Sequence, residues 1–307
     1  MTPNNSSSTR LGIIGFGQVG QAMAKVLTRS HSVTIFDLRT DQCRAHPLVE
    51  NGDVTLASSS AALVDASDIV ILCLPTPEAS HAVAAHISGA MRPGLIVMET
   101  STVTPQDVAA LDAVLSPGGA RVVDTAVIGG IHALSSGQAV FLVGAAQDDS
   151  DPISAVLKQL AAEVFYLNRQ GGGMRAKLVA NAVSHGVYVV LSEAIAVATA
   201  QDIPMSVIYR LLARESGLSR PLTHRIGERL FNGNFAGGMS TANARKDSKL
   251  FLETAHELKV PVFAIQAAHS VYEIAACEGM AADDYAIVAT LWEKWIGRTL
   301  RAEEVSP

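Results

Sequence analysis

Short apolar runs separated by segments of helical length fill the first half of the chain. Each run is bounded by Gly, Pro or Asp, a pattern typical of strands that are buried on both faces of a parallel sheet. The predicted strands are Leu11–Ile14, Val33–Phe36, Asp68–Leu74, Leu95–Met98, Arg121–Asp124, Val140–Val143 and Val164–Leu167. Predicted helices between them cover 18–28, 59–66, 78–90 and 104–115. The alternation predicts a doubly wound α/β domain.

The pattern changes after Gly171-Gly172-Gly173, where strand-like runs stop. The remaining apolar positions recur with helical spacing. Predicted helices cover 174–201, 206–215, 221–230, 243–258, 261–278 and 284–298. We therefore expect a flexible tail over 1–9, a nucleotide-binding sheet domain over 10–168 and an all-α domain over 169–307.

Composition narrows the class of protein. The 307 residues are 49% hydrophobic and 17% charged, with a net charge of −6, which excludes a disordered chain and gives no electrostatic reason to bind nucleic acid. The start of the chain lacks the basic and apolar stretches of a signal peptide. Three scattered cysteines favour a reduced, cytoplasmic protein. The uncharged stretch 125–147 is long enough to span a bilayer, but its glycines and polar residues favour two buried strands with a loop between them, so we expect no membrane segment.

A glycine motif follows the first predicted strand and opens a helix. The hexapeptide Gly15-Phe16-Gly17-Gln18-Val19-Gly20 is a G-x-G-x-x-G pattern in the context that dinucleotide binding requires. Its glycines permit a tight turn, close approach of a pyrophosphate and close packing of helix on strand. Asp37 ends the second predicted strand and can accept hydrogen bonds from ribose hydroxyls. The motif predicts a Rossmann-type domain that binds NAD in preference to NADP, a preference that the nearby Arg39 could soften.

Lys177 and Asn181 are candidates for catalysis. They lie four residues apart on the long predicted helix and so share one face, which Ser184 and His185 extend by a turn. Spacing alone leaves two interpretations equally open: the face is solvated, or it looks into a cleft against the nucleotide. In a cleft, partial burial would lower the pKa of Lys177 toward the working pH and suit it to proton transfer at a carbonyl or hydroxyl oxygen.

Together with the glycine motif, two further segments carry a family resemblance. Gly171-x-Gly173-x-x-x-Lys177-x-x-x-Asn181 and the pair Lys246-Asp247 resemble motifs of the β-hydroxyacid dehydrogenases, which include 3-hydroxyisobutyrate dehydrogenase, tartronate semialdehyde reductase and, more distantly, 6-phosphogluconate dehydrogenase. The resemblance covers nearly the whole chain from Arg10 onward. It implies that Lys177 is the general acid/base, that Asn181 supports substrate binding and that Lys246 approaches the cofactor.

Two loops extend this resemblance. Leu74-Pro75 resembles the family's turn along the cofactor, and the segment 99–105 resembles its Asp-x-Ser-Ser/Thr-x-x-Pro segment, in which Thr102 reaches the nicotinamide side and the substrate. The implied cofactor contacts are thus Gly15, Phe16, Gly17, Gln18, Val19, Gly20, Asp37, Leu74, Pro75, Thr102 and Lys246.

The substrate loop departs from the family pattern Asp-x-Pro-Val-Ser-Gly-Gly. Ile128 replaces the serine whose hydroxyl normally helps to hold a substrate carboxylate, and Ala126 replaces the proline. The amides of Gly129 and Gly130 can still donate. The loop is therefore expected to bind a carboxylate more weakly or to accept an apolar group, and His132 is a candidate for a compensating donor, although a plain loop residue is the simpler interpretation.

Other polar and aromatic residues give weaker signals. His185 fits a substrate contact or a histidine inside a helix bundle equally well. His81 and His86 lack the ligand pattern of a zinc site and suit exposed helix positions, so no metal is expected. Cys73 suits a small core residue. Trp292 and Trp295 suit packing or a subunit contact.

The sequence therefore predicts an NAD(P)-dependent oxidoreductase that interconverts a small β-hydroxy acid, or a related hydroxylated compound, and its carbonyl. Two alternatives stay open. Imine reductases share the two-domain build but usually carry Asp or Tyr in place of Lys177, and a non-catalytic NAD-binding protein would fit the altered loop. The Ala-rich, weakly charged second domain predicts a homodimer or homotetramer, with a small molecule as the other partner.

Overall fold

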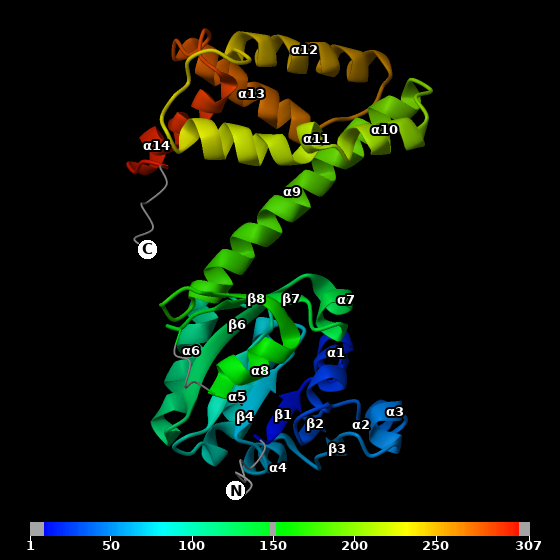
Figure 1. Ribbon diagram of the computed structural model, residues 1–307, viewed down its shortest axis with the longest axis vertical. Coiled ribbons are helices and arrows are strands. Elements are labelled where there is room, and N and C mark those ends of the chain that lie inside the picture. Colours follow the sequence, from blue (N-terminus) through cyan, green and yellow to red (C-terminus); the bar gives the residue numbers. More distant parts are fainter. Residues whose placement is uncertain (1–8, 148–151, 301–307) are drawn as a thin grey trace, which may run out of the picture. The chain divides into compact units, whose positions relative to one another are not determined.

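The computed structural model describes residues 9–147 and 152–300 and divides into two compact units (Figure 1). The first unit extends to Ala182 and the second begins at Val183. The division falls inside one long helix, α9 (Gly172–Ala200). This helix is long and apolar enough to cross a membrane by length and composition alone, and a single such helix is weak evidence of a membrane span.

An eight-stranded sheet forms the centre of the first unit, with strand order β3-β2-β1-β4-β5-β6-β7-β8. Neighbouring strands are parallel except β6 and β7, which pair antiparallel. The first six strands have the order of a dinucleotide-binding sheet. The strands are β1 (Leu11–Ile14), β2 (Val33–Phe36), β3 (Thr55–Leu56), β4 (Ile69–Leu72), β5 (Ile96–Glu99), β6 (Arg121–Ile128), β7 (Ala139–Val143) and β8 (Ala161–Tyr166).

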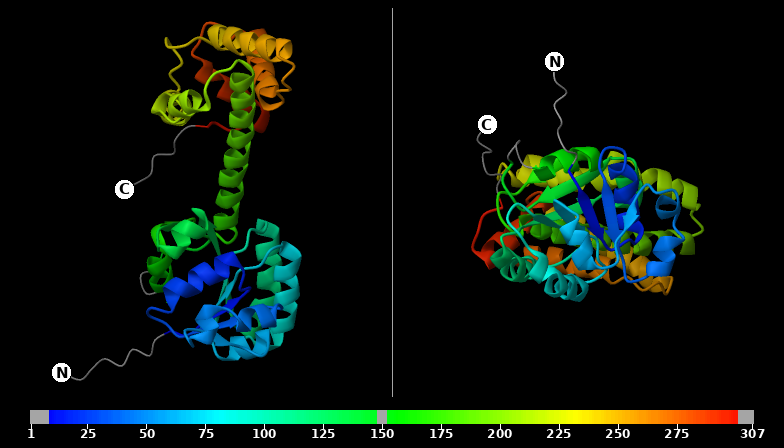
Figure 2. Two further views of the ribbon diagram at one scale, coloured as in Figure 1. Left: turned by 90° about the vertical axis from the view of Figure 1, so that its right-hand side faces the viewer. Right: turned by 90° about the horizontal axis from the view of Figure 1, so that it is seen from below.

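Helices cover both faces of this sheet (Figure 2). One face packs on α1, α7 and α8 around Met23, Phe141 and Leu157, and the other on α4, α5 and α6 around Leu63 and Leu111. Burying each such side chain contributes about 1.5–3 kcal/mol. The helices of this unit are α1 (Gln18–Leu27), α2 (Thr40–Arg44), α3 (Pro47–Glu50), α4 (Ser60–Asp65), α5 (Pro77–Ile87), η1 (Ser88–Ala90), α6 (Pro105–Leu115), η2 (Ser116–Gly118), α7 (Gly130–Ser135) and α8 (Pro152–Leu160).

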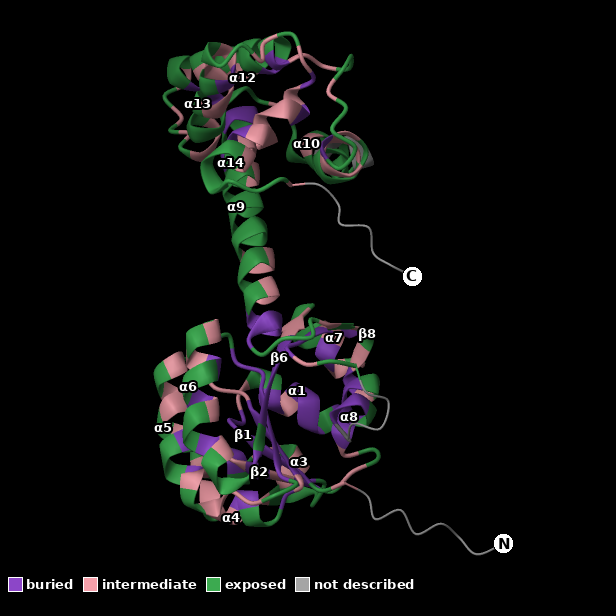
Figure 3. Ribbon diagram, turned by 90° about the vertical axis from the view of Figure 1, so that its left-hand side faces the viewer, coloured by how far each residue is buried: buried purple, intermediate pink, exposed green. Residues whose placement is uncertain are grey.

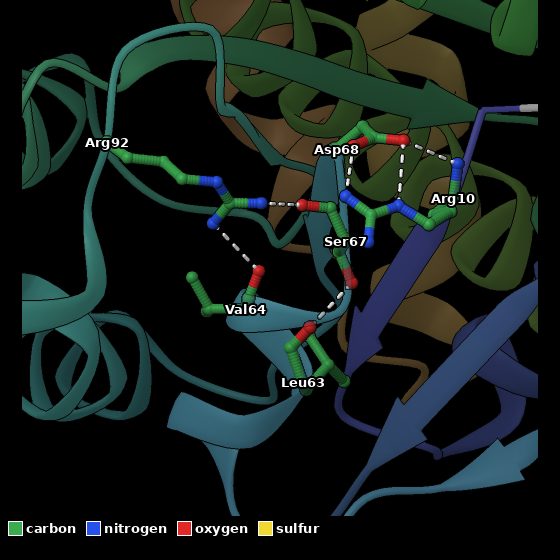
Figure 4. Close-up of polar contacts among 6 residues, drawn as sticks. All are labelled: Arg10, Leu63, Val64, Ser67, Asp68 and Arg92. Atoms are coloured by element: carbon green, nitrogen blue, oxygen red, sulfur yellow. Dashed lines mark hydrogen bonds and ion pairs between the residues drawn. The ribbon is translucent and has the colours of Figure 1, made fainter.

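Two arginines join the segments at the amino ends of the central strands (Figure 4). The Arg10 guanidinium pairs with Asp68 at 2.6 Å, which ties the starts of β1 and β4. Arg92 donates to the carbonyl oxygens of Val64 and Ser67 at 3.1 and 2.5 Å. These contacts close the end of the sheet that is opposite to the carboxyl ends, where parallel α/β sheets bind their ligands.

The second unit contains only helices and connecting segments among its described residues. The pair α12 and α13 packs side by side, and η3 packs against η4. Most of α9 is exposed or half-buried (Figure 3). The helices are α10 (Met205–Leu212), α11 (Glu215–Arg220), η3 (Pro221–Leu230), α12 (Thr241–Glu257), α13 (Ala264–Cys277), η4 (Tyr285–Val288) and α14 (Ala289–Ile296).

The predicted fold class, a Rossmann-type sheet domain followed by an all-α domain, is confirmed, and the differences are local. The edge strand β3 was not expected, because two residues give no apolar run. The sheet is parallel except between β6 and β7, which pair antiparallel. Within 125–147 the two strands are present, but α7 stands where a loop was expected. The predicted tail over 1–9 lies outside the described residues, apart from residue 9.

Candidate active site

The glycine motif forms a tight turn between β1 and α1. Gly15 has a φ of 97°, and a Cβ there would lie 2.2 Å from the carbonyl oxygen of Cys73. A Cβ on Gly20 would lie 2.1 Å from the carbonyl oxygen of Gly15. Both positions therefore require glycine. Gly17 begins the helix without a side-chain cap, and Gln18 and Val19 are exposed on its first turn. This uncapped helix start leaves backbone N–H groups and a positive dipole end for a phosphate, so the turn fits a dinucleotide.

Asp37 lies at the end of β2 beside this turn, and all of its acceptor positions are filled. One oxygen accepts from the Phe16 N–H at 2.8 Å and from Arg39 Nη2 at 2.9 Å. The other accepts from the Arg39 N–H at 2.9 Å and from Arg39 Nε at 3.0 Å. The Arg39 side chain lowers the pKa of Asp37 to about 2. Since a carboxylate offers about four acceptor sites, a ribose hydroxyl must displace Arg39 to reach it.

The turns after β4 and β5 are joined by hydrogen bonds. Ser101 Oγ accepts from the Leu74 N–H at 2.8 Å, next to the exposed Pro75. Thr102 follows and is exposed. Because β4 is parallel to β1 and β5 is parallel to β4, these turns emerge at the same edge of the sheet as the glycine turn.

Glu99 is a buried acid that sequence reasoning missed as a site residue. Its side chain is fully buried, one oxygen accepts from the Ser101 N–H at 2.7 Å, and burial raises its pKa. Its other oxygen and Ser80 Oγ are both buried without a hydrogen-bond partner in the described part of the chain. In the sequence, the only sign of this buried acid is that Glu99 stands where the family segment has an aspartate.

Lys177 lies in the first unit, near the start of α9. Its Nζ donates to the carbonyl oxygen of Val127 on β6 at 2.5 Å. Burial lowers its pKa from the usual value of 10.5. Asn181, one turn further along, is half-buried, whereas Ser184 and His185 are exposed. The Lys177 amine thus lies against a strand of the sheet, whereas the continuation of its helical face at Ser184 and His185 is exposed.

Most of the predicted substrate loop belongs to β6, which ends at Ile128, and only its two glycines follow the strand. Ile128 is half-buried and packs against an apolar cluster that includes Met174. Gly129 and Gly130 follow with φ values of 107° and 69°, which favour glycine. Both glycines and His132 are exposed. The loop thus presents an apolar side chain and backbone amides within the same unit as Lys177.

Lys246 and Trp292 belong to the second unit. Lys246 is exposed on α12 and pairs with Asp247 at 2.9 Å. The rings of Trp292 and Trp295 meet edge to face at 5.3 Å, and both side chains are exposed.

Histidines and cysteines outside these groups have local partners. His81 contacts Asp107 at 2.9 Å, and its side chain remains 39% exposed. His86 is exposed, and its ring contacts the Ala82 carbonyl oxygen at 2.7 Å. Burial raises the pKa of Cys73 to about 12, so its thiol is inert. Within 9–147 and 152–300, no group of three or more His, Cys, Asp or Glu side chains is arranged to hold a metal ion.

The sheet order, the glycine turn and the acidic residue at the end of β2 define a dinucleotide-binding oxidoreductase. Residues 10–168 match the model of the NAD-binding domain of 6-phosphogluconate dehydrogenase, and residues 171–292 match the model described as NAD-binding of NADP-dependent 3-hydroxyisobutyrate dehydrogenase. The chain belongs to the β-hydroxyacid dehydrogenase family. It is accordingly an NAD(P)-dependent oxidoreductase.

Curated relatives align over almost the whole chain. The 2-(hydroxymethyl)glutarate dehydrogenase of Eubacterium barkeri is 25% identical over 293 residues, covering 94% of this chain and 97% of that protein. The mitochondrial 3-hydroxyisobutyrate dehydrogenase of Drosophila melanogaster is 26% identical, covering 92% of this chain and 89% of that protein.

Similar solved structures support the fold. A reductive aminase from Aspergillus terreus, solved with NADPH and ethyl levulinate, superposes with a TM-score of 0.83 at 21% identity, covering 93% of this chain and 100% of that chain. An imine reductase from Pseudomonas sp. gives 0.84 at 18% identity, with 93% and 100% coverage. At these identities the likeness concerns the architecture and leaves the substrate open.

Proposed function

We propose that Lys177 is the general acid/base of this dehydrogenase and that the substrate is a small β-hydroxy acid or a related alcohol. The observation that carries the proposal is the position of the Lys177 amine. It is half-buried, it contacts β6 at Val127, and burial lowers its pKa. Burial shifts the Lys177 pKa in the direction that makes the neutral amine, the form that accepts a proton, more abundant at a given pH.

A nicotinamide cofactor, when bound beside the glycine turn, would supply the hydride transfer to or from the carbinol carbon. The protein moves the proton. Neutral Lys177 removes the hydroxyl proton in oxidation, and protonated Lys177 gives a proton to the carbonyl oxygen in reduction. Asn181, one helical turn away, is proposed to hold the same oxygen, while Thr102 and the amides of Gly129 and Gly130 are proposed to orient the substrate.

We propose NAD as the preferred cofactor, with NADP as a weaker one. The ionised carboxylate of Asp37 repels a 2′-phosphate and accepts from ribose hydroxyls once Arg39 moves aside. Arg39 is mostly exposed and lies 3.9 Å from the position of a Cβ on Gly17, so its guanidinium borders the phosphate-binding turn. From this position the Arg39 guanidinium can partly neutralise the charge of a 2′-phosphate. Lys246 is proposed as a further cofactor contact.

The substrate is proposed to carry an apolar group close to the altered loop. Ile128 offers no hydrogen bond to a carboxylate, and its side chain continues the apolar cluster around Met174. The exposed amides of Gly129 and Gly130 still offer donors. Hydroxy acids with an apolar substituent, and uncharged alcohols, should therefore be better substrates than small polar hydroxy acids.

This function is tested by measuring the reduction of NAD and of NADP with a panel of hydroxy acids and uncharged alcohols. A separate assay measures the oxidation of NADH with cyclic imines. Lys177→Ala should lower kcat on the best alcohol by about 10²–10⁴-fold, the usual contribution of general acid–base catalysis, with unchanged NADH affinity. Lys158→Ala, at an exposed lysine of α8, is the matched control and should retain wild-type turnover. Wild-type turnover in Lys177→Ala would overturn the assignment.

Two other results of the screen would redirect the proposal. Turnover of imines without turnover of any alcohol would favour the imine-reductase alternative, and NAD binding without hydride transfer to any compound would favour a binding protein.

Ile128→Ser tests the substrate class: it should improve kcat/KM for polar hydroxy acids relative to apolar ones. An unchanged ratio would exclude Ile128 from substrate selection.

We also propose a cytoplasmic homodimer or homotetramer with no nucleic-acid or membrane partner. Val179, Val183, Val187 and Val190 are exposed and form one stripe along α9, because they recur every three to four residues. The stripe begins two residues after Lys177, which is about 200° around the helix. A second copy could cover it while leaving the lysine face free, and the mass in solution measures this directly.

A further inference from the structure

Asp124 is a carboxylate buried in the centre of the sheet, and its oxygens bind the start of α9. It lies on β6, between β5 and β7, and is fully buried. One oxygen accepts from the Gly171 N–H at 2.8 Å, and the other accepts from the Met174 N–H at 3.0 Å. Met174 lies in the first turn of α9, where backbone N–H groups lack intrahelical partners, and Gly171 is the residue directly before the helix. Asp124 therefore caps α9 from a different element of the fold.

Two glycines leave the space that this carboxylate occupies. A Cβ on Gly144 would lie 1.8 Å from one oxygen of Asp124, and a Cβ on Gly173 would lie 3.0 Å from the other. The Gly173 Cβ would also lie 2.2 Å from the Leu142 carbonyl oxygen. Any larger residue at either glycine would move the carboxylate or the helix. The cap is thus built from three positions that are distant in the sequence.

The same strand also holds the catalytic lysine. Val127, three residues after Asp124 on β6, accepts the hydrogen bond from Lys177 Nζ. Lys177 follows Met174 by three residues, which is less than one helical turn. Strand β6 thus contacts the start of α9 twice, once through the Asp124 carboxylate and once through the Val127 carbonyl oxygen. A shift of the helix start relative to β6 would displace the lysine amine.

We propose that Asp124 is a positioning residue for the reaction: it fixes the first turn of α9 so that the Lys177 amine stays at the substrate. This inference rests on the proposed role of Lys177. In Asp124→Asn the side chain keeps its size, but its amide group faces an N–H and one of the two hydrogen bonds is lost. A misplacement of about 1 Å lowers turnover by about 10²-fold, so we expect kcat to fall by about 10- to 100-fold.

A double-mutant cycle tests this proposal through its dependence on Lys177. The variants are Asp124→Asn, Lys177→Ala and both together, and the measurements are single-turnover hydride transfer, NADH affinity and Tm. If Asp124 acts through Lys177, Asp124→Asn lowers the rate about 10- to 100-fold in the wild type and by less than twofold in the Lys177→Ala background. NADH affinity should stay within about twofold of the wild type, because the glycine turn is untouched.

Glu193→Gln is the matched control. Glu193 is a buried carboxylate that accepts from the N–H groups of Phe263, Ala264 and Ile265 at 2.6, 2.8 and 3.0 Å, and so caps α13 within the second unit. Glu193→Gln should lower Tm as Asp124→Asn does, but it should leave kcat unchanged.

Additive losses in the cycle would overturn the positioning role and leave Asp124 a purely structural cap. Equal losses of kcat in Asp124→Asn and Glu193→Gln would also overturn it. Wild-type turnover in Lys177→Ala alone would overturn the proposed function instead, so the two failures are distinguishable.

Discussion

The two units bury their apolar side chains in different ways. In the first unit, three clusters of buried side chains pack on the sheet. Among the described residues, 18 of the 26 large apolar side chains that are exposed belong to the second unit, although that unit is the smaller one. Large exposed apolar surfaces usually mark interaction sites. The first unit therefore buries most of its large apolar side chains by itself. We propose that the second unit buries its exposed apolar side chains only against another subunit.

Two phenylalanines give the largest expected contrast between the units. Phe141 is fully buried in the sheet, whereas Phe263 at the start of α13 is 77% exposed. Phe141→Ala should lower the free energy of unfolding by about 3–5 kcal/mol, because it removes a buried ring and leaves a cavity. Phe263→Ala should cost well under 1 kcal/mol in a dilute, dissociated sample. Chemical denaturation measures both, and equal costs in the two variants would contradict the contrast.

Much of the fold could be predicted from the sequence. The buried parallel strands appear in it as continuous apolar runs, and α9 appears as one long apolar segment of helical character. The glycine turn was equally accessible, since its residues are adjacent. The α7 helix was missed, because it begins at Gly130, and both Gly130 and the preceding Gly129 have left-handed backbone. Neither the Lys177–Val127 nor the Asp124–Gly171 contact could be predicted from spacing. Each joins residues about 50 positions apart, and only the strand pairing brings them together.

The apolar stripe of α9 gives the second contrast. Val187→Asp places a charge where we propose that another subunit packs, and an unpaired buried charge costs several kcal/mol. The variant should dissociate at concentrations where the wild type is assembled, as measured by light scattering after gel filtration. Ser270→Asp, at an exposed position of α13, is the control and should keep the wild-type mass. An unchanged mass in Val187→Asp would show that this stripe is outside the interface.

Arg39 gives the smallest effect, a change of cofactor preference within the first unit. Arg39→Ala frees both oxygens of Asp37 for ribose hydroxyls and removes the counter-charge to a 2′-phosphate. The ratio of kcat/KM for NAD over NADP should rise by about tenfold, equivalent to about 1.4 kcal/mol. Arg44→Ala, which removes an exposed partner of Asp41, should leave the ratio unchanged. A falling ratio would mean that Arg39 assists NAD rather than NADP.

The pH dependence of hydride transfer, measured in both directions on the same substrate pair, tests the central role of Lys177 most directly. Oxidation needs the neutral amine and reduction needs the protonated one. Since burial lowers the pKa of Lys177 from 10.5, oxidation should accelerate and reduction should slow as the pH rises, with a shared midpoint below that value. Lys177→Ala should abolish both dependences. Parallel slopes in the two directions, or slopes that persist in Lys177→Ala, would contradict the account.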